Sequence, residues 1–138
     1  MKFTTTMFAS VLLLGVSLTA SNTSMAQAAS CDEPTTYKLM VHTKNDKPTR
    51  VTMLGKDAFY LYDVCIGDTI EWQIVGPAKK IFVQFAEGTP FNGGGKTDSN
   101  NNGKISIVVG DTATAGADYK YDIGLGENVW DPRIIIAK

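Results

Sequence analysis

A strict two-residue alternation over residues 68–75 constrains the fold more than any other feature of this sequence. Gly67 and Asp68 are turn-forming residues, and the residues that follow them fall into two alternating sets. The first set is Asp68, Ile70, Trp72 and Ile74, and the second is Thr69, Glu71, Gln73 and Val75. Because successive side chains of a strand point to opposite faces, this period predicts a half-buried strand with Trp72 in the core.

The rest of the chain is also divided into short patterned segments separated by turn residues. We expect strands near 37–42, 50–54, 58–64, 80–85, 104–109, 118–123 and 133–137, with a break at 45–48 and a long Gly/Asn-rich loop over 87–103. Beyond the first 28 residues, no segment keeps a 3.6-residue period over the length of a helix. Many short strands at close spacing predict an all-β domain.

Residues 1–28 have the pattern of a signal peptide that is removed on export. Lys2 precedes a largely apolar run over 7–18, and the segment ends with the cleavage motif Ala26-Gln27-Ala28. A membrane-spanning helix needs about 20 apolar residues, so this run is too short to cross a bilayer. We therefore expect a mature protein of residues 29–138, a single domain that is periplasmic or secreted.

The two cysteines, Cys31 and Cys65, both lie in the part of the chain predicted to be exported. In an oxidising compartment a single pair of cysteines indicates one disulfide bond. The alternative is a lipid anchor on Cys31, because residues 28–31 have some likeness to a lipoprotein cleavage box. However, Ala28 stands where such a box has leucine, and the mostly polar residues 21–27 separate Cys31 from the apolar run. The disulfide is the preferred interpretation.

The charged residues show no strong imbalance of sign. The chain has 13 basic and 14 acidic residues, a net charge of −1, and charges of both signs alternate without runs. Nucleic acids and anionic membrane surfaces attract proteins with a concentrated positive field. The sequence therefore predicts neither as a partner.

The phrase Gly67-Asp68-Thr69-Ile70-Glu71-Trp72 resembles the Gly-Asp-Thr-(Val/Ile)-x-Trp strand of cupredoxins, which are small exported β-sandwiches that often carry copper. The likeness continues in order through 77–85, the aromatic segment 119–121 and the β-branched segment 131–136. It covers most of the mature chain, although the motif also occurs in other secreted sandwiches. The resemblance implies a cupredoxin-like Greek-key β-sandwich of about seven or eight strands.

A blue copper site requires two imidazoles and a thiolate, usually with a weak axial methionine. In cupredoxins the first histidine follows the Trp strand, and the other ligands lie in the loop before the last strand. The matching segments here, 76–80 and 122–131, contain no His, Cys or Met. The only histidine, His42, lies in the first alternating segment, where we expect it on the solvent side. The comparison thus implies a cupredoxin-like domain without copper and argues against an electron carrier.

Residues 98–105 match the first half of a calcium-binding loop of the pattern D-x-N-x-N-G-x-I. Asp98, Asn100 and Asn102 would supply side-chain oxygens, and Gly103 would allow the sharp turn. Val109 occupies the twelfth position, where a bidentate glutamate belongs, so the site would bind calcium weakly. The alternative is a polar turn without a metal, since Asn-Gly before an alternating segment is a strong turn signal.

No arrangement of catalytic residues can be recognised in the sequence. There is one histidine, no Gly-x-Ser-x-Gly elbow, and no spacing that selects one carboxylate pair for acid–base work. We therefore expect a non-enzymatic binding or accessory domain whose partner is an unidentified protein or small ligand. A weak calcium-binding protein is the first alternative and an electron carrier is the disfavoured second one. Trp130, before Asp131-Pro132, is expected to cap the core or to form an exposed binding contact.

Overall fold

The computed structural model describes residues 30–138, so the predicted signal peptide, residues 1–28, lies outside the described part of the chain. Within this part the chain forms eleven strands and no helix, and thus no helix that could cross a membrane. The strands are β1 (Thr36–Lys44), β2 (Lys47–Met53), β3 (Lys56–Asp57), β4 (Tyr60–Val64), β5 (Thr69–Val75), β6 (Phe82–Phe85), β7 (Lys96–Asp98), β8 (Lys104–Val108), β9 (Asp118–Leu125), β10 (Asn128–Trp130) and β11 (Arg133–Ile136).

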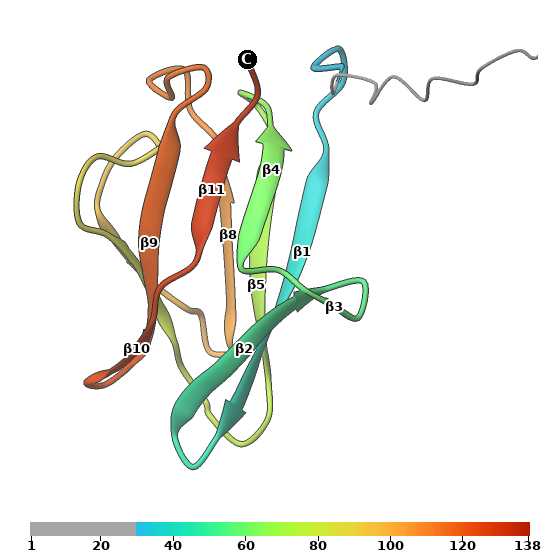
Figure 1. Cartoon of the computed structure of the whole chain (residues 1–138). Coiled ribbons are helices and arrows are strands. Elements are labelled where there is room, and N and C mark those ends of the chain that lie inside the picture. Colours follow the sequence, from blue (N-terminus) through green and yellow to red (C-terminus); the bar gives the residue numbers. More distant parts are fainter. Residues whose placement is uncertain (1–29) are drawn as a thin grey trace, which may run out of the picture.

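These strands form two sheets that pack face to face (Figure 1). The first sheet has the order β3-β2-β1-β5-β8, and the second has the order β4-β11-β9-β6-β7 with β10 paired to β9. Two neighbouring pairs are parallel, β1 with β5 and β4 with β11, whereas the other pairs are antiparallel. The predicted all-β sandwich is confirmed.

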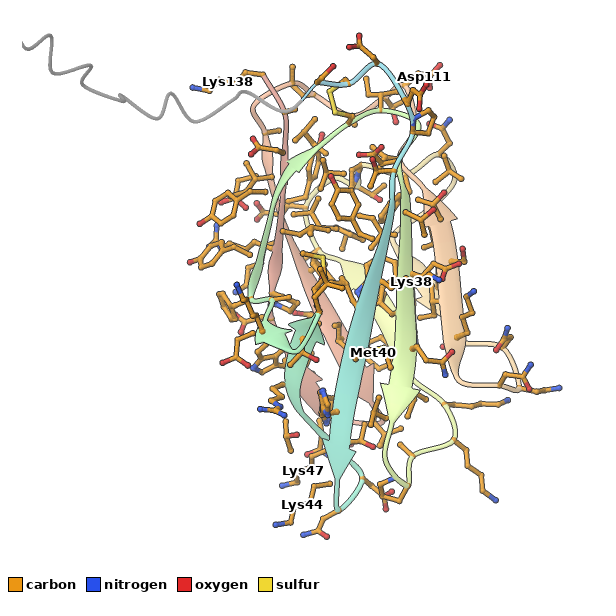
Figure 2. The ribbon with its side chains drawn as sticks, turned by 90° about the vertical axis from the view of Figure 1, so that its right-hand side faces the viewer. Lys38, Met40, Lys44, Lys47, Asp111 and Lys138 are labelled. Carbon is orange, nitrogen blue, oxygen red and sulfur yellow. A yellow bond between two sulfur atoms is a disulfide. The ribbon has the colours of Figure 1, made fainter. Side chains whose placement is uncertain are left out.

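The core lies between the two sheets, where inward-facing side chains of both layers meet (Figure 2). Trp72 is completely buried, as the alternation of its strand predicts, and its indole Nε1 donates a hydrogen bond to the Tyr121 hydroxyl at 3.3 Å. Phe85 and Phe91 pack their rings against this pair. An aromatic cluster of this kind excludes water from the centre of the sandwich while it satisfies the polar atoms of Trp72 and Tyr121.

The structure corrects several predicted boundaries. The break expected at 45–48 is confined to Asn45 and Asp46, which adopt positive φ angles of 50° and 56°, and Pro48 already belongs to β2. The expected loop 87–103 contains the short strand β7, and the region 122–131 is a β9–β10 hairpin. These short edge segments form because a neighbouring strand supplies hydrogen bonds, and their own sequences carry little signal of it.

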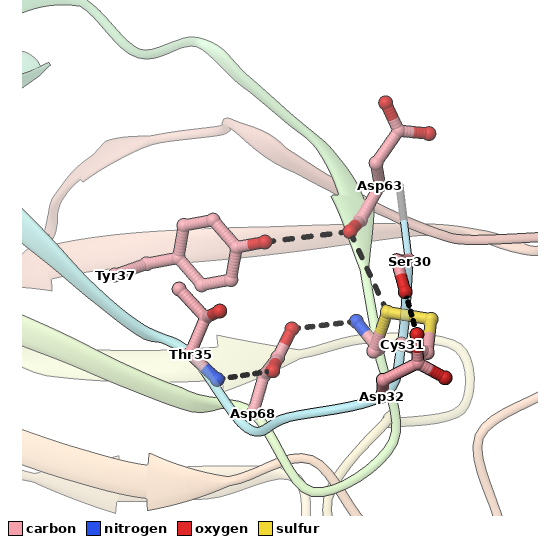
Figure 3. Close-up of a disulfide and its surroundings, with 8 residues drawn as sticks. Ser30, Cys31, Asp32, Thr35, Tyr37, Asp63 and Asp68 are labelled. Atoms are coloured by element: carbon pink, nitrogen blue, oxygen red, sulfur yellow. Dashed lines mark hydrogen bonds between the residues drawn. A yellow bond between two sulfur atoms is a disulfide. The ribbon is translucent and has the colours of Figure 1, made fainter. Parts of the chain in front are cut away.

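The predicted disulfide is present and closes one end of the sandwich (Figure 3). Cys31 and Cys65 have Cα atoms 5.6 Å apart. Beside them, the buried Asp68 carboxylate accepts one hydrogen bond from the Thr35 amide and another from the Cys65 amide, both at 2.7 Å. Asp68 therefore joins the segment before β1 and the turn after β4 to the start of β5, which it immediately precedes. This end of the molecule is fixed by both a covalent bond and a buried carboxylate.

Candidate functional site

The proposed calcium-binding residues lie at the turn between the two sheets. Asp98 is the last residue of β7, and Asn100 and Asn102 belong to the connection that leads into β8. The Asn100 side-chain oxygen accepts hydrogen bonds from the backbone amides of Asn102 and Lys104, each at 3.0 Å. An amide oxygen has two lone pairs, and both are used here. Asn100 thus stabilises the turn itself, and calcium binding stays a hypothesis for titration to decide.

The other potential ligands are dispersed. His42 lies on the outer side of β1, half-buried, with Nε2 2.9 Å from the Thr52 hydroxyl. Across residues 30–138, no group of three or more His, Cys, Asp and Glu side chains is placed to hold a metal ion. The segment 76–80 and the β9–β10 hairpin, which correspond to the copper-binding loops of the resemblance, lie at ends of the strands.

The strongest candidate is the outer face of β4, β11 and β9, neighbouring strands in the front layer of Figure 1. Tyr60 pairs with Arg133, and Arg133 pairs with Lys120, so these three residues form one row across the sheet. Ile135 pairs with Asp118 in the parallel row two residues further along β11. We call the outward residues of these strands the tyrosine–arginine face; its members are Tyr60, Tyr62, Asp118, Lys120, Arg133 and Ile135.

An aromatic series runs along one side of this face. The rings of Tyr60 and Tyr62 stack with centroids 5.7 Å apart, because residues two apart on a strand project to the same side. Phe59 contacts Tyr60 edge-to-face at 5.0 Å and Trp130 at 5.4 Å. Tyr60 and Tyr62 are 44% and 58% exposed. Trp130, by contrast, is half-buried against the core, which confirms its predicted capping role and anchors the series.

Ion pairs occupy the centre of the face. Arg133 Nη1 lies 2.6 Å from Asp118 Oδ2, and Lys120 Nζ lies 2.8 Å from Asp131 Oδ2. The hydrogen bond from Arg133 to Asp118 raises the pKa of the guanidinium above its ordinary value. The hydrogen bond from Lys120 lowers the pKa of Asp131. Each of these four side chains therefore has a partner of the opposite sign.

A depression of about 410 Å³ opens beside these pairs. Its lining consists of Ala86, Glu87, Asp118, Lys120 and Arg133. Ligand pockets typically have volumes of about 300–1,000 Å³. The depression is thus large enough for part of a small ligand, with donors from β9 and β11 and acceptors from β9 and the segment after β6.

Recognition at this face must use side chains, since the backbone of β11 is already bonded on both sides. β11 pairs with β4 along one edge and with β9 along the other. The Arg133 amide, for example, donates to the Phe59 carbonyl at 2.8 Å. A ligand on the face would therefore contact aromatic rings and paired charges. These groups suit binding, and they do not form a nucleophile and its base.

The sequence reading missed this face. The Tyr60-Leu61-Tyr62 spacing signals two aromatic rings on one side of a strand, and that signal was available. The sequence gives no signal that Arg133 lies beside these rings, because Tyr60 and Arg133 are 73 positions apart in the numbering. They meet only through the parallel pairing of β4 with β11. Asp118 and Lys120 join them through a further antiparallel pairing.

Comparisons with known proteins give a distant structural likeness. No protein-family model matches this chain, and no curated protein matches it. A reduced Cu(I) form of a proline-to-glycine mutant of amicyanin at pH 4 has a TM-score of 0.42 and 14% identity, over 72% of this chain and 81% of that chain. An oxidised methionine-to-leucine mutant has a TM-score of 0.42 and 16% identity, over 71% and 80%. An oxidised methionine-to-lysine mutant has a TM-score of 0.43 and 14% identity, over 72% and 81%.

Proposed function

We propose that this protein is an exported, non-enzymatic cupredoxin-like domain without copper that binds a partner through the tyrosine–arginine face. The observation that carries the proposal is the exposed, stacked pair Tyr60 and Tyr62 beside the ion-paired Arg133. Tyrosine, tryptophan and arginine are the residues that most often dominate binding energies at interfaces. The chain exposes two tyrosines and an arginine together on one sheet.

The support of this face is rigid, which favours binding. Leu61 and Ile134 alternate with the exposed residues and are buried at 2% and 0% exposure, so the strands cannot rotate without opening the core. A rigid support reduces the entropy that is lost when side chains become ordered in a complex. The tyrosines are also held by stacking before any ligand arrives, so less of their side-chain freedom remains to be lost on binding.

A comparison of variants tests the proposal. Immobilised wild-type protein, a Tyr60→Ala/Tyr62→Ala variant and a Leu54→Ala control are used to capture components of the extracytoplasmic fraction of the source cells. Leu54 is 93% exposed in the turn after β2, so its variant controls for the loss of an exposed apolar side chain elsewhere. We expect the double variant alone to lose what the wild type retains. Truncating a dominant residue costs about 2 kcal/mol or more, which is about a 30-fold loss of affinity.

The opposite outcome is equally clear. If the double variant is folded by circular dichroism and still captures the same components as the wild type, this face is not the binding surface. The folding check is straightforward because both tyrosines project away from the core.

A further inference from the structure

We propose that the ligand of the tyrosine–arginine face is a neutral saccharide chain, whose sugar rings lie against the tyrosines while their hydroxyls bind the ion pairs. This inference rests on the proposed function and specifies its ligand. It follows from three properties of the face: the pairing of its two bases with carboxylates, the placement of its aromatic rings, and the hydrogen bonding of β11 to a neighbouring strand on each side.

The pairing of the two bases favours an uncharged ligand over an anion. Arg133 is paired with Asp118 at 2.6 Å and Lys120 with Asp131 at 2.8 Å. An anion would have to compete with these carboxylates for the two bases, and a cation would have to compete with the bases for Asp118 and Asp131. Glu87, which lines the depression and forms no ion pair within residues 30–138, adds a carboxylate that can accept from a hydroxyl. A hydroxyl group can insert without such competition, since it donates to a carboxylate and accepts from a guanidinium at the same time.

The aromatic side of the face supplies the apolar contact that a sugar ring needs. A pyranose ring carries axial C–H groups on its faces, and their burial against an aromatic ring is favourable for the same reason as any apolar burial. Tyr60 lies directly across from Arg133 in the β4–β11 register. A ring that packs on the tyrosine pair therefore lies over the strand next to the one that carries Arg133, and the two backbones are about 4.8 Å apart.

The face is long enough for more than one ring. From Tyr60 the row continues through Arg133 to Lys120, across three neighbouring strands, and then reaches the depression beside Glu87. Three strands at about 4.8 Å spacing extend over roughly 10 Å between the outer two. A chain of linked rings can follow this row, with its first ring on the tyrosines and the next in the depression.

An extended peptide is a poorer fit at this position. Peptides that bind sheets add a strand to an exposed edge and form backbone hydrogen bonds with it. β11 has neighbours on both sides, so the centre of the face offers no backbone donors or acceptors. Only side chains are available there, and their paired charges match the dense hydroxyls of a saccharide better than the sparse polar groups of a peptide.

Titration of the isotope-labelled mature protein with cellohexaose, xylohexaose, chitohexaose and maltohexaose tests this proposal by nuclear magnetic resonance. We expect at least one of them to shift the amide signals of Tyr60, Lys120 and Arg133 with saturation. A Tyr60→Ala/Tyr62→Ala variant should bind at least about 30-fold more weakly, while Leu54→Ala should bind like the wild type. Because the ligand is uncharged, raising NaCl from about 0.05 to about 0.5 M should change the affinity less than about twofold.

The outcomes separate the two proposals. If none of the four saccharides shifts these signals, the saccharide proposal is overturned. The proposed function then still stands when the tyrosine variant loses a captured protein, and it falls when that variant loses nothing. A saccharide that binds elsewhere, with signals of the face unchanged, also overturns the assignment of this site.

Discussion

Asp68 gives the sharpest prediction about stability, because it is a buried carboxylate that accepts two short hydrogen bonds from backbone amides. It is 1% exposed, and its two oxygens accept from Thr35 N and Cys65 N at 2.7 Å each. The substitution Asp68→Asn keeps the shape of the side chain. It replaces one acceptor oxygen by an NH₂ group, which then faces a backbone N–H, so that one of the two amides loses its partner.

The expected cost follows from these two contacts. A buried donor left without an acceptor costs about 1–3 kcal/mol, and conversion of the remaining charge-assisted hydrogen bond to a neutral one costs about 1 kcal/mol more. Asp68→Asn should therefore lower the free energy of unfolding by about 2–4 kcal/mol. With a urea m-value of about 1.5 kcal/mol/M, the midpoint should fall by roughly 1.3–2.7 M.

Urea unfolding of the disulfide-bonded mature protein, followed by tryptophan fluorescence, measures this change. Asp63→Asn is the matched control, since it makes the same chemical change at an exposed residue five positions earlier. Asp63 has a positive φ of 57°, a conformation that asparagine also tolerates, and its backbone carbonyl contact with the Tyr37 hydroxyl is preserved. If the urea midpoint of Asp68→Asn matches that of the control, the Asp68 carboxylate does not stabilise the fold through its hydrogen bonds with the Thr35 and Cys65 amides.

Three further predictions concern other parts of the molecule. Replacing both Cys31 and Cys65 by serine should lower the free energy of unfolding by about 3–4 kcal/mol, because the unfolded chain regains the entropy that the disulfide loop removes. Urea unfolding compared with the wild type measures this loss, and an unchanged midpoint would contradict the prediction. If the turn at Asn100 needs no metal, millimolar calcium should leave the melting temperature unchanged, whereas a rise that Asp98→Ala abolishes would establish the calcium site. Burial raises the pKa of Tyr121 above its ordinary 10.0. The contribution of the neutral Tyr121 hydroxyl to the free energy of unfolding is therefore complete below pH 10 and is lost as the pH rises towards the folded-state pKa. Urea unfolding at alkaline pH should show a smaller loss of stability in Tyr121→Phe than in the wild type, and an identical loss would contradict the prediction.

The regular strands could be predicted because their pattern is local. Trp72 and its neighbours show the two-residue period of a half-buried strand, and the structure places Trp72 at 0% exposure. The disulfide could also be predicted, since Cys31 and Cys65 are the only cysteines of the sequence. The short strands β7 and β10 could not be, because segments of three residues are strands only by virtue of the β6 and β9 partners beside them.

At the candidate site, too, the strand could be predicted from its local pattern, whereas its neighbours could not. Residues 58–64 were recognised as an aromatic strand, but their role depends on which strand lies next to them. Strand pairing brings residues from distant positions into one row, and a sequence pattern contains no record of that register. The parallel pairing with β11 places Tyr60 next to Arg133, and the antiparallel pairing with β9 then adds Asp118 and Lys120.

The sequence by itself determined the all-β class, the half-buried strand at 69–75 and the pairing of the two cysteines. Each of these is written in residue types and short spacings, which local sterics and side-chain chemistry convert directly into structure. Only the tertiary structure decided that the Asp68 carboxylate is buried and accepts hydrogen bonds from the backbone amides of Thr35 and Cys65. It also decided that Tyr60 and Tyr62 share a face with the ion pair of Arg133 and Asp118. Those features exist because strands far apart in the chain pack side by side, and no local pattern specifies their neighbours.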